Sequence, residues 1–221
     1  MFPLRDSEPS YSKPVVTMFI IAVNLLIFLY EASLDPYTLN ALIGQYGLVP
    51  DHFHVSAIFT SMFLHGGWLH VLGNMWFLWI FGDNIEDILG HEKYLIFYLL
   101  CGIAAAITQT YFNFDSQVPM VGASGAIAGV MGAYLVKFPH ARIRTLIFLL
   151  FIFFIDVPAW FMLIYWFAVQ FFGGVGSIAE STANSGGTAF FAHVGGFLTG
   201  ILLIHLMGTR QRYVRYYNPP Y

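Results

Sequence analysis

The chain has 221 residues, of which 58% are apolar and only 10% are charged, and its formal net charge is −3. A soluble domain carries about a quarter charged residues, so this composition excludes an ordinary soluble globule and a disordered chain. The small negative charge offers no basic surface for nucleic acid, which leaves an integral membrane protein. The single cysteine, Cys101, excludes a disulfide framework and a cysteine-based zinc site.

Six apolar segments approach the roughly 20 residues that a helix needs to cross a bilayer. The first, residues 15–34, is long for the apolar region of a signal peptide, and no cleavage site of small residues follows it. The fifth lies within 146–172, where we expect one span over 157–172 after a membrane-associated approach segment; Pro158 also allows two short elements meeting there. The remaining spans are predicted at 68–88 (interrupted at Gly73, Asn74 and the FGDN turn), 93–112, 120–138 and 188–207.

The positions of the basic residues test this number of spans, because lysine and arginine collect on the cytoplasmic side of membrane proteins. With six spans and the N-terminus inside, all nine lysines and arginines fall on one side, whereas five or seven spans would divide them. The sequence therefore predicts an all-α membrane protein with six transmembrane helices and both termini cytoplasmic. Its expected parts are a cytoplasmic tail (1–14), a six-helix domain (15–207) and a second cytoplasmic tail (208–221).

Three segments then lie on the outer side of the membrane. Residues 35–67 contain no lysine or arginine and remain rather apolar, which predicts an interfacial or re-entrant element. Residues 113–119 form a short connection. Residues 173–187 are small, polar and glycine-rich, a composition that suits a movable lid.

Four polar residues lie in the outer half of the predicted spans, where a polar side chain is costly and therefore informative. His70 and Asn74 are four residues apart, on one face of the second span. Ser124 lies near the outer end of the fourth span, and His193 lies five residues into the sixth. Topology alone thus predicts a serine, two histidines and an asparagine at similar depth in three helices.

Small residues at four-residue spacing suggest that two of these helices touch. Gly125 and Gly129 occur in the fourth span, and Gly196 and Gly200 occur in the sixth. This spacing lets helix backbones approach closely. Packing the two glycine faces together would bring Ser124 near the histidine of the sixth span.

The four polar residues supply the groups that acyl transfer needs. A serine hydroxyl becomes a nucleophile when a base such as histidine takes its proton. Asn74 and His70 can donate hydrogen bonds to a developing oxyanion, as can the free N–H groups where the helix of Ser124 begins. No aspartate or glutamate is placed to orient His193, so a Ser–His dyad fits better than a triad.

Other interpretations of the same residues remain open at this point. Each of the four could instead bond to a helix backbone or bridge two helices. The sequence contains no HExxH motif for a zinc protease. A metal cluster could be drawn from four histidines, but no carboxylate is placed to complete it; these are His52, His54, His65 and His70.

The motifs resemble those of the rhomboid family of intramembrane serine proteases. The stretch Gly122-Ala123-Ser124-Gly125 is similar to the family's GxSG nucleophile motif. Residues 70–74 (HVLGN) are similar to its HxxxN element, residues 192–196 (AHVGG) to its AHxxG element, and residues 81–86 (FGDNIE) to the end of its second span. In order and topology these motifs cover nearly the whole chain, about 15–207.

The resemblance implies specific roles for the matched residues. Ser124 would be the nucleophile and His193 the general base, while Asn74 and His70, with the backbone N–H of Ser124, would form the oxyanion hole. Neither a metal nor a cofactor is implied. The expected partners are single-span membrane protein substrates and the lipid bilayer, with no nucleic acid.

The chain also departs from the family pattern. Some members place an aromatic residue four positions after the serine, stacked on the base, where this chain has Ala128; some have a bulky residue where it has Gly73. Some carry an arginine in the first outer loop, and residues 35–67 have none. The alternative function is a rhomboid-like pseudoprotease that binds membrane clients without cleaving them. Short tails and a minimal six-helix form suggest a prokaryotic plasma (inner) membrane.

Overall fold

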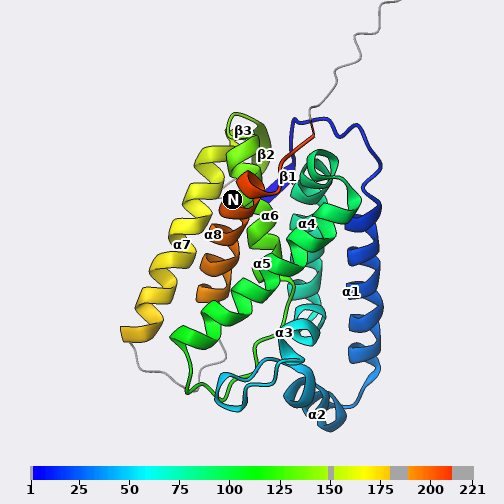
Figure 1. The fold of residues 1–221 in the computed structure, drawn as a ribbon, viewed down its shortest axis with the longest axis vertical. Coiled ribbons are helices and arrows are strands. Elements are labelled where there is room, and N and C mark those ends of the chain that lie inside the picture. The colour runs from blue at the N-terminus through cyan, green and yellow to red at the C-terminus, as the bar shows by residue number, and fades with distance from the viewer. Residues whose placement is uncertain (1, 149–151, 180–188, 211–221) are drawn as a thin grey trace, which may run out of the picture.

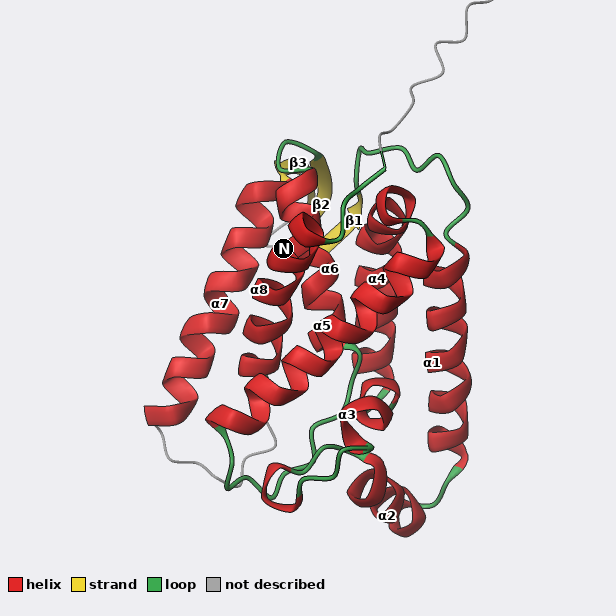
Figure 2. Cartoon of the chain, in the orientation of Figure 1, coloured by secondary structure: helices red, strands yellow, loops and turns green. Residues whose placement is uncertain are grey.

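The computed structural model describes residues 2–148, 152–179 and 189–210. Long helices stand side by side, with a small sheet at one end of the bundle and short helices at the other (Figures 1 and 2). The long helices are α1 (Val15–Ser33), α4 (Trp68–Leu89), α5 (His91–Phe112), α6 (Ser124–Lys137), α7 (Ala159–Ala179) and α8 (Phe190–Leu206). The short ones are α2 (Pro36–Tyr46) and α3 (Ala57–Thr60), with 3₁₀ turns at Pro50–His52 and Ser61–Phe63.

Helix α6 lies at the centre of the bundle and packs against α4, α5 and α8 (Figure 1). Every residue from Gly125 to Tyr134 is buried. Small residues make this possible, because half of the first eight positions of α6 are glycine or alanine and let neighbouring backbones come close. At 14 residues α6 is about 21 Å long, so it begins well inside the bundle.

Within the described ranges, three helices are long and apolar enough to cross a membrane by themselves: Val15–Ser33, His91–Phe112 and the first 18 residues of α7, Ala159–Gly176. The apolar helices α6 and α8 are shorter. Helix α4 is continuous, although the sequence predicted interruptions at Gly73, at Asn74 and at the FGDN turn. The interruption was wrong because a glycine or asparagine in a long helix costs only about 1 kcal/mol, which packing overrides.

The sheet corrects the all-α prediction. Strands β1 (Phe2–Arg5), β2 (Arg142–Phe148) and β3 (Ile152–Pro158) form an antiparallel sheet in the order β1-β2-β3. On β2, Ile143 and Thr145 are fully buried while Arg142 and Arg144 are exposed, which is the two-residue period of a strand. The approach segment predicted before the fifth span is therefore a β-hairpin, and residues 2–5, within the predicted N-terminal tail, pair with it.

The segment predicted as a movable lid, residues 173–187, begins inside a helix. Helix α7 continues through Gly173 and Gly174 to Ala179, and these two glycines lie against Phe190 and Phe191. A Cβ added at Gly173 would lie 2.6 Å from the Phe190 ring and one at Gly174 would lie 3.1 Å from the Phe191 ring, so the glycines leave room for these side chains. Residues 180–188 of the predicted lid lie outside the described part of the chain. Residues 35–67, predicted as an interfacial or re-entrant element, contain the short helices α2 and α3 and both 3₁₀ turns.

Candidate active site

The structure brings Ser124 and His193 together. Ser124 is the first residue of α6, and His193 lies near the start of α8. The Nε2 atom of His193 lies 2.8 Å from the Ser124 hydroxyl oxygen, within hydrogen-bond distance. The imidazole is buried, with 8% of its residue surface exposed, whereas the serine is partly exposed. An imidazole and a hydroxyl are therefore in contact, and the hydroxyl side of the contact is not fully buried.

The glycine faces predicted from the sequence produce this contact. A Cβ atom added at Gly196 would overlap the backbone oxygen of Gly125, and one added at Gly200 would overlap that of Gly129. The close approach of α6 and α8 is therefore confirmed, and only glycine permits it at these positions. Because His193 lies less than one turn before Gly196, the backbone contact fixes where the imidazole meets α6.

His70 and Asn74 point toward the loop that leads into α6. A Cβ added at Gly122 would lie 2.8 Å from His70 Nε2 and 3.5 Å from Asn74 Nδ2. Gly122 also has φ +126°, a conformation that L side chains rarely adopt, so the sequence needs glycine there for two reasons. The two side chains thus flank the approach to Ser124 from α4.

Both side chains present donors. The Gly66 N–H donates to His70 Nδ1 at 3.3 Å, so a neutral His70 ring carries its proton on Nε2, the atom that faces Gly122. Asn74 Nδ2 is buried and has no hydrogen-bond partner among the described residues. An unpaired buried donor costs about 1–3 kcal/mol, so a site that keeps one has a reason to do so.

The start of α6 adds backbone donors. The first four N–H groups of a helix have no partner within it, and they carry partial positive charge. No side chain among the described residues caps α6. Nδ2 of Asn74 and Nε2 of His70 face Gly122, two residues before Ser124, so these donors approach the same segment that leads into α6.

Sequence reasoning missed two residues of α7 that contact His193. The side-chain oxygen of Gln170 lies 2.7 Å from His193 Nδ1, and the glutamine is buried. The Trp166 ring lies one turn earlier on the same face, with its centroid 5.5 Å from that of His193. The signal for Gln170 was present, because a lone amide in an apolar span marks a function more often than packing. The aromatic partner absent at Ala128 is supplied from another helix.

The other histidines considered as metal ligands do not form such a site in the described residues, where no group of three or more ligating side chains occurs. His65 packs edge-on against His70, with ring centroids 5.2 Å apart. Its backbone N–H donates to the buried carboxylate of Glu31 at 3.2–3.3 Å. Glu31 thereby ties α1 to the segment that precedes α4, and so supports the position of His70.

The geometry can support acyl transfer: a hydroxyl, a base within hydrogen-bond distance, a fixed orientation for that base, and donors beside the reacting oxygen. Ser124 and His193 come from two closely packed helices of the bundle, α6 and α8.

A family model described as the Rhomboid domain matches residues 52–210. The chain belongs to the rhomboid family. It is 32% identical over 151 residues to Rhomboid protein 1, mitochondrial, from Saccharomyces cerevisiae, covering 66% of this chain and 40% of that protein. It is also 32% identical over 144 residues to the human Presenilin-associated rhomboid-like protein, mitochondrial, covering 61% and 36%. Identity to the Rhomboid protease GluP of Bacillus subtilis is 32% over 127 residues, covering 56% and 24%.

Two consequences follow from the comparisons. The chain spans less than half the length of the curated relatives it matches. The prediction of a prokaryotic plasma membrane is contradicted, because the yeast and human relatives are named as mitochondrial. Helix number follows from the fold and helix length from bilayer thickness, and these differ little between such membranes, so the minimal six-helix form does not identify the membrane.

Proposed function

We propose that this chain is an intramembrane serine endopeptidase that cleaves transmembrane segments of membrane proteins. The observation that carries the proposal is the 2.8 Å contact between His193 Nε2 and the Ser124 hydroxyl. In this mechanism His193 takes the hydroxyl proton as Ser124 Oγ attacks the scissile carbonyl carbon, giving a tetrahedral intermediate. His193 then gives that proton to the leaving amine, and water hydrolyses the acyl-enzyme by the same route in reverse.

The oxyanion of the tetrahedral intermediate would be bound by Asn74 and His70 with the backbone N–H of Ser124. The unpaired Nδ2 of Asn74 supports this role, because the donor is buried and ready before substrate arrives. A preorganised donor needs no rearrangement when the negative charge develops. No metal or cofactor takes part in the proposed mechanism.

Six membrane spans, formed by α1 and α4 to α8, and both termini on one side belong to the same proposal. The proposal is supported by the basic residues, which lie at one end of the bundle. Lys93, at the start of α5, donates to the carbonyl of Met207, just after α8. The other basic residues in the described ranges lie at the same end, on the sheet, before α1 or at the ends of α6 and α8: Arg5, Lys13, Lys137, Arg142, Arg144 and Arg210. The sorting is what the positive-inside rule requires.

The protease domain would comprise residues 15–207, with flanking segments 1–14 and 208–221. The substrates would be single-span membrane proteins that reach Ser124 from within the bilayer. From the names of the yeast and human relatives, the membrane we propose is mitochondrial.

The test uses the full chain, purified in detergent, with a model single-span substrate. Wild type should cleave it and should react with a fluorophosphonate probe, whereas Ser124→Ala and His193→Ala should do neither and should melt as wild type does. Ser33→Ala, which removes an exposed hydroxyl bonded to a backbone carbonyl, is the matched control and should keep full activity. Full cleavage by Ser124→Ala would refute the proposal. Substrate binding by wild type without cleavage would favour the pseudoprotease.

A further inference from the structure

The hydrogen bond between α7 and the base has a consequence for regulation. We infer that Gln170 is a positioning residue which holds His193 in its reactive tautomer, so that the base is correctly set only while α7 lies against α8. The inference rests on the proposed function, since it assumes that His193 is the base. It describes how the position of α7 would determine whether His193 is set to take a proton from Ser124.

The tautomer follows from what an amide oxygen can do. The side-chain oxygen of Gln170 only accepts hydrogen bonds, so the Nδ1 atom facing it at 2.7 Å must carry the proton. A neutral imidazole then has its lone pair on Nε2, the atom 2.8 Å from Ser124 Oγ. Without an acceptor at Nδ1, the neutral imidazole can carry its proton on Nε2 instead. In that tautomer the imidazole would donate to the serine and could not take its proton.

A glutamine suits this position better than a carboxylate. Gln170 is buried on a helix that is otherwise almost entirely apolar, and an isolated charge is costly in such a place. A neutral amide orients the ring without that cost. When His193 accepts the serine proton, its Nδ1–H bond to Gln170 becomes charge-assisted and stronger. The contact therefore favours the state that follows proton transfer more than the resting state, which is the requirement for a contribution to rate.

Both contacts that orient the ring come from α7. Trp166 and Gln170 are four residues apart and share one helix face, so the aromatic ring beside His193 and the acceptor at Nδ1 move as a unit. The next contact on this face is aromatic, with the rings of Phe167 and Phe197 4.8 Å apart. Helix α7 lies at the edge of the bundle with α8 beside it (Figure 1). Displacement of this part of α7 from α8 would remove the acceptor and the aromatic contact together.

The first experiment compares two substitutions at one position. Gln170→Leu keeps the bulk of the side chain and removes the acceptor; kcat should fall about 10²-fold with KM unchanged, because general-base catalysis is lost while substrate contacts remain. Gln170→Glu restores an acceptor and should recover kcat at high pH. Its activity should be lost at a higher pH than in wild type, since a negative charge favours the protonated ring. His70 on α4 is the neighbouring titratable group that acts on His193, and it is unchanged in both variants.

Gln109→Leu is the matched control. Gln109 on α5 accepts a hydrogen bond from the backbone N–H of Ala192, the residue before His193, and its own bond does not involve the imidazole. This variant should melt at a lower temperature while the pH dependence of kcat stays as in wild type. If the pH profile of Gln109→Leu were displaced as far as that of Gln170→Glu, loosening of α8 would explain the effect. That result would overturn the inference.

A second experiment tests the dependence on α7. Phe167→Ala loosens the contact with Phe197 without changing a residue that touches the imidazole. It should lower kcat, but by less than Gln170→Leu does. The double variant with Gln170→Leu should lose no more than Gln170→Leu alone, because both act through one bond. Additive losses would overturn the coupling between the α7 position and the base.

The last measurement needs no activity, so it separates failure of the inference from failure of the proposed function. The ¹⁵N NMR signals of His193 should show protonated Nδ1 in wild type and in Ser124→Ala, and a shift toward protonated Nε2 in Gln170→Leu. Unchanged signals in Gln170→Leu, unchanged kcat, or a raised KM with constant kcat would each overturn the inference. If Gln170→Leu does not fold, the pH displacement and NMR signals of Gln170→Glu decide in its place.

Discussion

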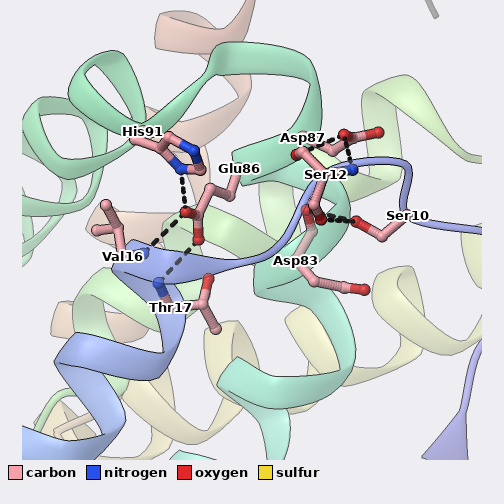
Figure 3. Close-up of polar contacts among 8 residues, drawn as sticks. All are labelled: Ser10, Ser12, Val16, Thr17, Asp83, Glu86, Asp87 and His91. Carbon is pink, nitrogen blue, oxygen red and sulfur yellow. Dashed lines mark hydrogen bonds and ion pairs between the residues drawn. The ribbon is translucent and has the colours of Figure 1, made fainter.

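Helix α4 buries a carboxylate near its end and an amide near its start, and these two side chains differ in how far their hydrogen-bonding groups are used. Near the end of the helix, Glu86 is fully buried and its carboxylate is saturated: it accepts from the N–H groups of Val16 and Thr17 at 2.8 Å and contacts His91 Nδ1 at 2.6 Å (Figure 3). Near the start, twelve residues earlier, Asn74 keeps a buried donor without a partner in the described residues.

The difference is the one expected between a structural site and the proposed reactive one. At Glu86 the start of α1 presents its positive end to a carboxylate, which is the arrangement that a helix dipole favours. At the other end the start of α6 has no side-chain cap in the described residues, and Asn74 points toward the same place. We infer that the oxyanion formed during catalysis would occupy, near α6, the kind of position that Glu86 occupies permanently at α1.

The largest expected effect is on kcat, and it tests the start of α4, where Asn74 keeps an unpaired donor. Asn74→Ala should lower kcat by about 10²–10³-fold if Nδ2 serves as an oxyanion donor. The free energy of unfolding should stay the same or rise, because the substitution removes a buried donor that bonds to nothing in the resting state. Cleavage assays and thermal melts on the same preparation measure both quantities.

Asn84→Ala is the control on the same helix. Its side-chain N–H donates to the carbonyl of Glu8 at 3.1 Å, so its loss should cost about 1 kcal/mol of stability and leave kcat alone. If the two asparagine variants showed the same pattern, whichever it was, the proposed contrast between the ends of α4 would be wrong.

The next effect is on the free energy of unfolding, and it tests the hydrogen bonds of Glu86 near the end of α4. Glu86→Ala leaves two backbone N–H groups at the start of α1 without an acceptor and should lower the free energy of unfolding by about 3 kcal/mol. Fluorophosphonate labelling of the protein that remains folded should proceed at the wild-type rate, since the change lies about 18 Å along the helix from Asn74. Loss of labelling in folded protein would show that this end also serves the reaction.

The ability to predict these features from sequence depended on the kind of signal each carries. The contact between α6 and α8 was predictable because glycine at four-residue spacing has few other meanings in an apolar helix. Asn74 and Ser124 stood out because polar residues are rare in such segments. Gln170 had the same rarity, but its partner comes from a helix whose rotation about its own axis no local pattern fixes.

The β-hairpin was hidden for a different reason. Residues 146–158 are almost uniformly apolar, and uniform hydrophobicity does not distinguish a strand from a helix. The alternation that marks a strand occurs only in 142–145, and the pairing of β2 with residues 2–5 joins segments about 140 positions apart. Local sequence does not encode such a contact.

The smallest expected effect concerns a third helix start, that of α2, which is capped by an exposed carboxylate. The hydroxyl of Thr38 donates to Asp35 at 2.5 Å and, with the backbone N–H groups of Thr38 and Tyr37, holds the pKa of Asp35 below its usual range. Because the folded-state pKa is lowered, the contribution of this cap is complete above the ordinary aspartate value of about 3.9 and is lost as the pH falls through the folded-state value. The start of α2 should therefore stay intact at neutral pH and fray in acid.

Amide chemical shifts of Tyr37 and Thr38 followed against pH would detect the change. In Asp35→Asn, which keeps an acceptor but cannot titrate, the shifts should stay flat over the same range. A midpoint at or above the ordinary aspartate value would contradict the cap geometry. The expected outcome sharpens the contrast among the three helix starts. Asp35, at the start of α2, titrates in water, whereas Glu86, which faces the start of α1, is buried away from water. The start of α6 keeps its donors free for the negative charge that the proposed reaction creates.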